Sequence, residues 1–70
     1  MIRKRSIKVA GHETSVSLEE PFWDVLKEIA RAEGISLVAL VERIDRARTG
    51  NLSSALRLHA LGYLRARAGM

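Results

Sequence analysis

The sequence predicts a mostly α-helical chain that carries a short β-ribbon near its start. Residues 13–18 alternate polar and apolar side chains, which is the pattern of a strand with one buried face. Three segments follow, over residues 20–33, 36–48 and 52–67, and each places apolar side chains at helical spacing. Because so short a strand is not stable alone in water, we expect it to pair with the same strand of a second copy.

Length and composition restrict how such a chain is stabilised. Its 70 residues allow one domain, and the absence of cysteine excludes disulfides and thiolate metal sites. Two isolated histidines, His12 and His59, do not make a metal site, so we expect no metal and no cofactor. The 47% hydrophobic content is high for this length and favours a homodimer, or a higher-order assembly, as the source of extra stability.

The distribution of charge points to a polyanionic partner. The net charge is +4, and the bases gather at both ends of the chain. Residues 1–18 carry four bases and one acid, whereas residues 51–70 carry three arginines and no acid. Clusters of this kind favour binding to nucleic acid. No apolar segment follows the basic start, and no run approaches the roughly 20 apolar residues of a membrane span. We therefore expect a cytoplasmic protein with no membrane partner.

The first nine residues have two interpretations. They form either a basic arm that contacts a polyanion or an extra strand. The second interpretation rests on the alternation of polar and apolar residues over residues 6–9, with Ala10-Gly11-His12 as a turn. The sequence leaves both open, together with the question of whether residues 5–9 pair with the ribbon strand.

The helix boundaries are marked by residues with known positional preferences. Pro21 suits a first helical turn, and Gly34 suits the position that ends the first helix. Ser36 is a good N-cap for the second helix, and Asn51 or Ser53 can cap the third. Apolar residues of the strand and the helices are expected to form the core of the dimer: Val16, Leu18, Phe22, Leu26, Ile29, Leu40, Val41, Ile44 and Leu56.

Two sets of residues resemble a known family. Thr14-Ser15-Val16-Ser17-Leu18-Glu19-Glu20, followed by Phe22, Leu26, Ile29, Ala30 and Gly34-Ile35-Ser36, resembles the ribbon-helix-helix DNA-binding family of the Arc/MetJ type. Gly11-His12-x-Thr14-Ser15 and Gly50-Asn51-Leu52-Ser53-Ser54-Ala55-Leu56-Arg57 resemble landmarks of its short, stand-alone bacterial members. The resemblance covers nearly the whole chain. It implies an intertwined homodimer with an additional helix, whose paired strands enter the major groove of double-stranded DNA.

The resemblance also implies which residues contact DNA. It places Glu13, Ser15 and Ser17 on the outward face of the ribbon, where they contact base edges. A carboxylate accepts a hydrogen bond from cytosine N4 but repels phosphate, and family members often carry a basic or amide residue in place of Glu13. Phosphate contacts are expected from the basic start and from two helix starts: Arg3, Lys4, Arg5, Lys8, Ser36 and Ser53.

The chain has three helical segments where the basic family fold has two. Residues 34–36 lead into the segment 36–48, yet residues 52–57 also resemble the start of the second helix of the family. Either the segment 52–67 is an addition or residues 37–49 are an insertion, and the sequence leaves both open.

The function expected from these features is a DNA-binding transcriptional regulator. The alternative is a ribbon-helix-helix protein-interaction module, antitoxin-like or partner-binding, with weak or no DNA binding. Glu13 on the ribbon and the wide apolar surface of residues 52–67 favour that alternative, and a partner would then bind residues 52–67. Trp23 is expected to pack in the dimer. No nucleophile, acid and base cluster is present, so we expect no enzyme and no catalytic residues.

Overall fold

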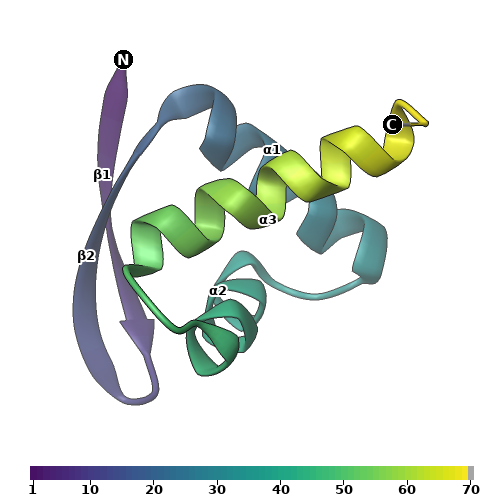
Figure 1. The fold of residues 1–70 in the computed structure, drawn as a ribbon. Coiled ribbons are helices and arrows are strands. Elements are labelled where there is room, and N and C mark those ends of the chain that lie inside the picture. Colours follow the sequence, from purple (N-terminus) through teal and green to yellow (C-terminus); the bar gives the residue numbers. More distant parts are fainter. Residues whose placement is uncertain (70) are drawn as a thin grey trace.

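The computed structural model describes residues 1–69, in which a β-hairpin is followed by three helices. Figure 1 shows the hairpin along one side of the molecule, with the helices packed against it and against each other. The predicted class, a ribbon followed by helices, is confirmed. The elements are β1 (Ile2–Val9), β2 (His12–Glu19), α1 (Glu20–Glu33), α2 (Leu37–Ala47) and α3 (Leu52–Arg67).

Residues 2–9 form a strand rather than a loose arm. β1 pairs antiparallel with β2 from Ile2 opposite Glu19 to Val9 opposite His12. Ala10 and Gly11 connect the strands with φ angles of 51° and 84°, and positive φ at both positions is the signature of a type I′ hairpin turn. Of the two interpretations that the sequence leaves open for these residues, the extra strand is therefore the one observed, and it occupies one edge of β2.

Alternation along the hairpin separates a buried face from an exposed face. Ile7 and Val9 of β1 and Val16 and Leu18 of β2 point toward the helices and are at most 5% exposed. Successive side chains of a strand point to opposite faces, so the residues between them point to solvent. The bases at the start of β1 conceal this alternation in the sequence.

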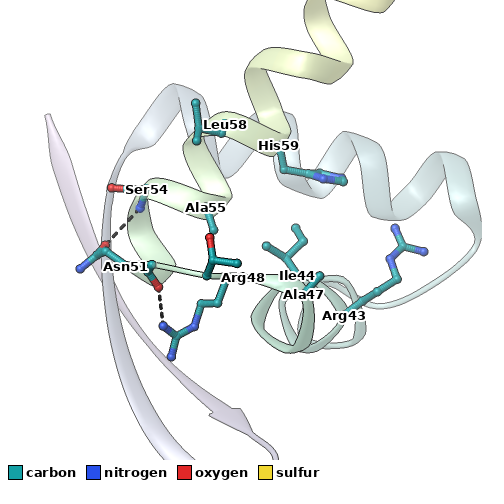
Figure 2. A pocket seen from close by; sticks show the side chains of 11 residues that line it. Arg43, Ile44, Ala47, Arg48, Asn51, Ser54, Ala55, Leu58 and His59 are labelled. Carbon is teal, nitrogen blue, oxygen red and sulfur yellow. Dashed lines mark hydrogen bonds between the residues drawn. The ribbon is translucent and has the colours of Figure 1, made fainter.

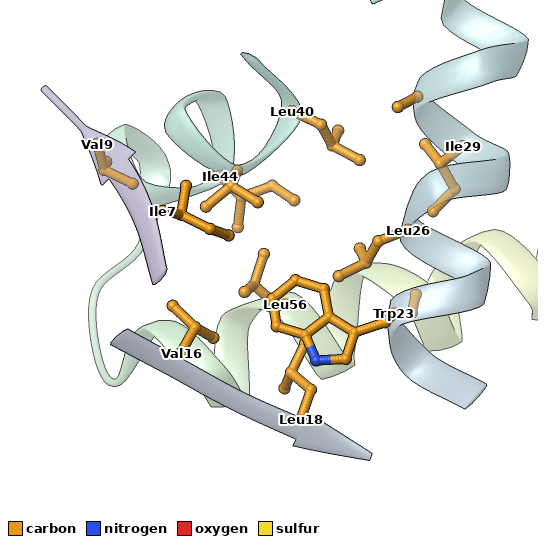
Figure 3. Close-up of a cluster of buried hydrophobic side chains, with 13 residues drawn as sticks. Ile7, Val9, Val16, Leu18, Trp23, Leu26, Ile29, Leu40, Ile44 and Leu56 are labelled. Atoms are coloured by element: carbon orange, nitrogen blue, oxygen red, sulfur yellow. The ribbon is translucent and has the colours of Figure 1, made fainter. Parts of the chain in front are cut away.

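The hydrophobic core lies between the hairpin and the three helices, as Figure 3 shows. Trp23 occupies its middle, and the Nε1 group of Trp23 donates a hydrogen bond of 2.9 Å to the backbone carbonyl of Arg3. This bond fastens α1 to β1 and satisfies the polar atom of an otherwise apolar ring. The largest fully buried side chains are Trp23, Leu18, Leu26, Ile29, Leu40, Leu56 and Val41.

Most residues expected in a dimer core are buried within one chain. Eight of the nine are at most 8% exposed in the isolated chain, so their burial requires no second copy. The exception is Phe22, which is half-buried, while the neighbouring Trp23 is 1% exposed. The buried face of α1 thus follows Trp23, Leu26 and Ala30, which also satisfy helical spacing.

Local side-chain and backbone contacts determine where the helices begin and end. Gly34 ends α1 with a left-handed φ of 70°, which glycine adopts at no steric cost. The Ser36 hydroxyl accepts a hydrogen bond of 3.0 Å from the Ala39 N–H and caps α2. The Asn51 side chain accepts one of 3.1 Å from the Ser54 N–H and caps α3. Of the two candidate caps for α3, Asn51 is the one used.

α3 differs from the other helices in how much apolar surface it leaves uncovered. Leu56 and Ala60 are buried against the rest of the chain. Leu58, Leu61 and Leu64 are 67%, 47% and 41% exposed. A large exposed apolar stripe is typical of an interaction surface.

Candidate nucleic-acid interface

The outward face of the hairpin is polar and carries a net positive charge. The register places Lys4 opposite Ser17, Ser6 opposite Ser15 and Lys8 opposite Glu13. We call this set of six residues the outer face. All six side chains are exposed. A face with short hydroxyl groups at its centre and amines along one strand matches what an extended ribbon needs to approach base edges and phosphates.

The outer face brings together five of the nine residues that the sequence suggested for DNA contacts. Glu13, Ser15 and Ser17 come from β2, and Lys4 and Lys8 come from β1. Ser6 lies among them and was not identified from the sequence. Its signal was the alternation of Lys4, Ser6 and Lys8, which the neighbouring arginines obscure.

Arg3 and Arg5 lie on the opposite face of β1. The Arg3 guanidinium is 3.8 Å from the Glu20 carboxylate, and its own backbone carbonyl accepts the Trp23 hydrogen bond. The Arg5 guanidinium lies over the Trp23 ring, 5.5 Å from the ring centre. A guanidinium stacked on a tryptophan is a favourable cation–π arrangement. The two arginines thus contact α1 and are separated from the outer face.

The two helices whose starts were suggested as phosphate sites pack against different strands. Ser53 is in the first turn of α3, which packs against β2, and Figure 1 shows this turn close to the hairpin. Ser36 begins α2, which packs against β1. Each helix start already has one N–H capped, by Asn51 in α3 and by Ser36 itself in α2.

An ion pair holds α3 to the end of the ribbon. The Arg57 Nε group donates a hydrogen bond of 2.8 Å to the Glu19 carboxylate, at the residue where β2 ends and α1 begins. The Arg57 guanidinium also lies 5.9 Å from the centre of the Phe22 ring. The hydrogen bond from Arg57 lowers the pKa of Glu19 below its ordinary value. This contact joins residues that are 38 positions apart in sequence, and no local pattern reveals it.

The hairpin tip has a similar support from α2. The Ala10 N–H donates a hydrogen bond of 3.3 Å to the Glu42 carboxylate. Ala10 has a left-handed φ of 51°, a conformation that costs an alanine about 1–2 kcal/mol. The Glu42 contact therefore helps to hold a strained turn, and the turn determines which side chains reach the outer face.

A cavity of about 550 Å³ opens between α2 and α3, as Figure 2 shows. Apolar side chains from both helices, including Ile44, Ala55 and Leu58, form part of its wall. Arg43 and Arg48 also line it. Their guanidiniums are engaged by neighbouring acids, Arg43 with Glu33 at 2.7 Å and Arg48 with Asp45 at 2.6 Å. The charge of this lining is therefore largely neutralised.

The described residues provide neither a metal-binding cluster nor a membrane-spanning helix. Within residues 1–69, no three His, Cys, Asp or Glu side chains are grouped so that they can hold a metal ion. The same part of the chain has no helix long and apolar enough to cross a membrane.

Comparisons with known proteins identify relatives of this fold. A family model described as a ribbon-helix-helix domain matches residues 2–64, which confirms the resemblance seen in the sequence. The structure is similar to that of an uncharacterized protein from Bordetella pertussis Tohama I, with a TM-score of 0.86 and 37% identity. That match covers 99% of this chain and 60% of the other. The comparison with curated proteins finds no match.

The extent of the family match bears on the origin of the three helices. The matched residues 2–64 include β1, all of α2 and most of α3. The family model therefore spans β1 and reaches into all three helices.

Proposed function

Because the chain belongs to the ribbon-helix-helix family, whose domains typically form homodimers and bind DNA, we propose that it is a homodimeric DNA-binding regulator of transcription in the bacterial cytoplasm. The observation that carries the proposal is the outer face. All six of its side chains are exposed, those at its centre are short, and lysines border it on one strand. No other exposed surface of residues 1–69 combines an extended backbone with this chemistry.

Ser15 and Ser17 are the proposed base contacts, with Glu13 beside them. Serine hydroxyls donate or accept hydrogen bonds at base edges, so they read sequence permissively. Glu13 lies opposite Lys8 in the register, and the lysine offsets the repulsion that a lone carboxylate meets in a phosphate-lined groove. This arrangement supports Glu13 as a partner for cytosine N4.

Lys4, Lys8 and the first turn of α3 at Ser53 are the proposed phosphate contacts. Both lysines share the outer face with the base-reading residues, and α3 packs beside β2. We assign Arg3 and Arg5 to the support of the hairpin instead, because both contact α1 through Glu20 and Trp23. Ser36 is assigned to capping α2.

Binding to duplex DNA at two salt concentrations tests the proposal. We expect affinity for random-sequence duplex at low salt that weakens steeply as salt rises, because each phosphate contact adds about 0.9 to the magnitude of the slope of log K against log salt. Sedimentation of the complex should give two chains per binding unit. The absence of any binding at low salt would refute the proposal.

The alternative function, a protein-interaction module, is favoured by one observation. Leu58, Leu61 and Leu64 present an apolar stripe that the chain itself does not cover. A variant with Leu58→Glu and Leu61→Glu should keep its DNA affinity if the stripe serves a separate partner. It should lose solution dimers and DNA affinity together if the stripe serves the homodimer.

A further inference from the structure

The cavity between α2 and α3 has the size and the wall composition of a small-molecule site. Its volume of about 550 Å³ lies within the range of about 300–1,000 Å³ that is typical of ligand pockets. Apolar side chains from both helices form part of the wall: Ile44, Ala47, Ala55 and Leu58. An apolar molecule placed between α2 and α3 is therefore covered on two sides.

The polar part of the wall is rich in hydrogen-bond donors. Arg43, Arg48 and His59 line the cavity, whereas no aspartate or glutamate of residues 1–69 is among its lining residues. Figure 2 shows the Arg43 guanidinium and the His59 ring at the same end of the cavity. A guanidinium has five N–H donors and no acceptor, and an imidazole has at least one N–H donor. This end is therefore suited to a ligand group that only accepts hydrogen bonds, such as a carboxylate.

One carboxylate of the chain already lies beside this end. Oε1 of Glu33, the last residue of α1, is 2.7 Å from Nη1 of Arg43. The hydrogen bond from Arg43 lowers the pKa of Glu33, with a smaller contribution from His59. A bidentate carboxylate engages two of the five N–H donors of an arginine, so Arg43 keeps donors for a second one. Both side chains of the ion pair are exposed, and exposed pairs are weak, so a ligand can share Arg43 or replace Glu33 at little cost.

We propose that the cavity between α2 and α3 binds a small carboxylic acid with an apolar body. The carboxylate binds Arg43 and His59, and the body packs against the apolar part of the wall. Burial of the body supplies most of the affinity, and the carboxylate supplies the selectivity. The site does not depend on the proposed function, because none of its lining residues belongs to the outer face.

Titration of the native chain with two matched probes, followed by NMR of the backbone amides, tests the site. The probe 2-naphthoate joins two fused rings to a carboxylate, and 2-naphthamide has the same rings with a neutral head group. The carboxylate should shift the signals of Ala47 and Ala55, and the amide should bind about tenfold more weakly, because it lacks the charge-assisted hydrogen bonds. Equal affinities would overturn the proposal. So would the absence of shifts at the cavity, which is the result expected if a second copy covers it.

Two pairs of charge variants test the recognition of the carboxylate. Arg43→Gln should lower the affinity for 2-naphthoate about tenfold, whereas Arg31→Gln, which removes the same charge from an exposed position of α1, should leave it unchanged. Glu33→Gln should raise the affinity, because it removes the competing carboxylate, and Glu28→Gln is its control. Circular dichroism checks that all four variants fold. A general attraction of the basic chain for anions predicts equal effects within each pair, and that result would overturn the proposal.

A variant that fills the cavity tests where the apolar body lies. Ala47 is exposed, is the last residue of α2 and lines the cavity. Ala47→Phe therefore takes up part of the space without displacing the core, and it should bind 2-naphthoate at least about tenfold more weakly than the native chain. Ala32→Phe, at an exposed position of α1 outside the lining, is the control and should bind as the native chain does. Undiminished binding by Ala47→Phe would place the ligand elsewhere and overturn the proposal.

Discussion

The two faces of the hairpin share one backbone but use their side chains in different ways. The inward face holds Ile7, Val9, Val16 and Leu18 against the helices, and none of them is more than 5% exposed. The outer face holds lysine, serine and glutamate, all exposed. The comparison shows that each polar residue of the hairpin must be assigned to a face before a role is given to it.

The bases of β1 illustrate the point. Arg3 and Arg5 lie on the inward side and contact Glu20 and the Trp23 ring, whereas Lys4 and Lys8 lie outward. Arginine suits the inward role because its planar guanidinium stacks on aromatic rings and pairs with carboxylates. Lysine, a strongly hydrated point charge on a flexible stem, suits a solvent-facing phosphate contact.

Removing the inward anchor should have the largest effect. Trp23→Ala should lower the free energy of unfolding by about 3–5 kcal/mol, since it leaves a cavity under the hairpin and removes the bond to the Arg3 carbonyl. That is a large part of the stability of a small domain, which is about 5–15 kcal/mol. Urea denaturation followed by circular dichroism measures it. Ser17→Ala on the outer face is the control and should change the value by less than about 0.5 kcal/mol.

Changes to the centre of the outer face should alter recognition without altering stability. Ser15→Ala with Ser17→Ala should reduce discrimination between duplex sequences by about 1 kcal/mol or more, because hydrogen bonds to base edges are lost. The salt slope should stay as in the native chain, since no phosphate contact is removed. Competition binding with a panel of duplexes measures both. A changed slope with unchanged discrimination would contradict the assignment of the serines to bases.

The turn that separates the two faces should respond to substitution in opposite directions. Ala10→Asn should raise the free energy of unfolding by about 1 kcal/mol, because asparagine tolerates the left-handed conformation that strains alanine. Gly11→Ala, at a φ of 84°, should lower it by about 1 kcal/mol or more for the same reason. Thermal melts of the pair measure the difference. Equal effects of the same sign would argue against a type I′ turn.

The smallest effect should come from the ion pair between Glu19 and Arg57. The hydrogen bond from Arg57 lowers the pKa of Glu19 below its ordinary value of 4.5. The pair therefore stabilises the fold above pH 4.5 and loses this contribution as the pH falls further. Arg43 lowers the pKa of Glu33 in the same way. Glu19→Gln should flatten, but not abolish, the acid dependence of the melting temperature. An unchanged pH profile in this variant would contradict the assignment.

Much of the fold follows from residues with strong local preferences. Pro21, Gly34 and Ser36 mark helix ends because their backbone or side-chain chemistry suits those positions alone. The β2 alternation marks a strand for the same local reason. Ala10-Gly11 is a weaker turn signal than Asn-Gly, and the bases of β1 hide its alternation, so a hairpin within one chain could not be decided from the sequence.

The site was harder to predict because its parts are brought together over long distances. Sequence alone could place Ser15 and Ser17 outward by counting along one strand. It could not assign Arg3 to the inward face and Lys4 to the outer face. That assignment depends on the register with β2 and on the Trp23 ring that lies under the inward face. Nor could it choose Trp23 over Phe22 for the core, because both satisfy helical spacing.

The pairing of β1 with β2 inside one polypeptide has a consequence for how the protein reaches its native state. A chain that completes its own hydrophobic interior folds in a first-order process, without waiting to meet a twin. Its unfolding midpoint should then be constant over the concentrations at which the chain is monomeric, and should rise only where two copies associate, because association stabilises the native state. Association becomes a later and separate equilibrium, so the cellular abundance of the protein can govern occupancy of its target without governing whether the newly made polypeptide survives.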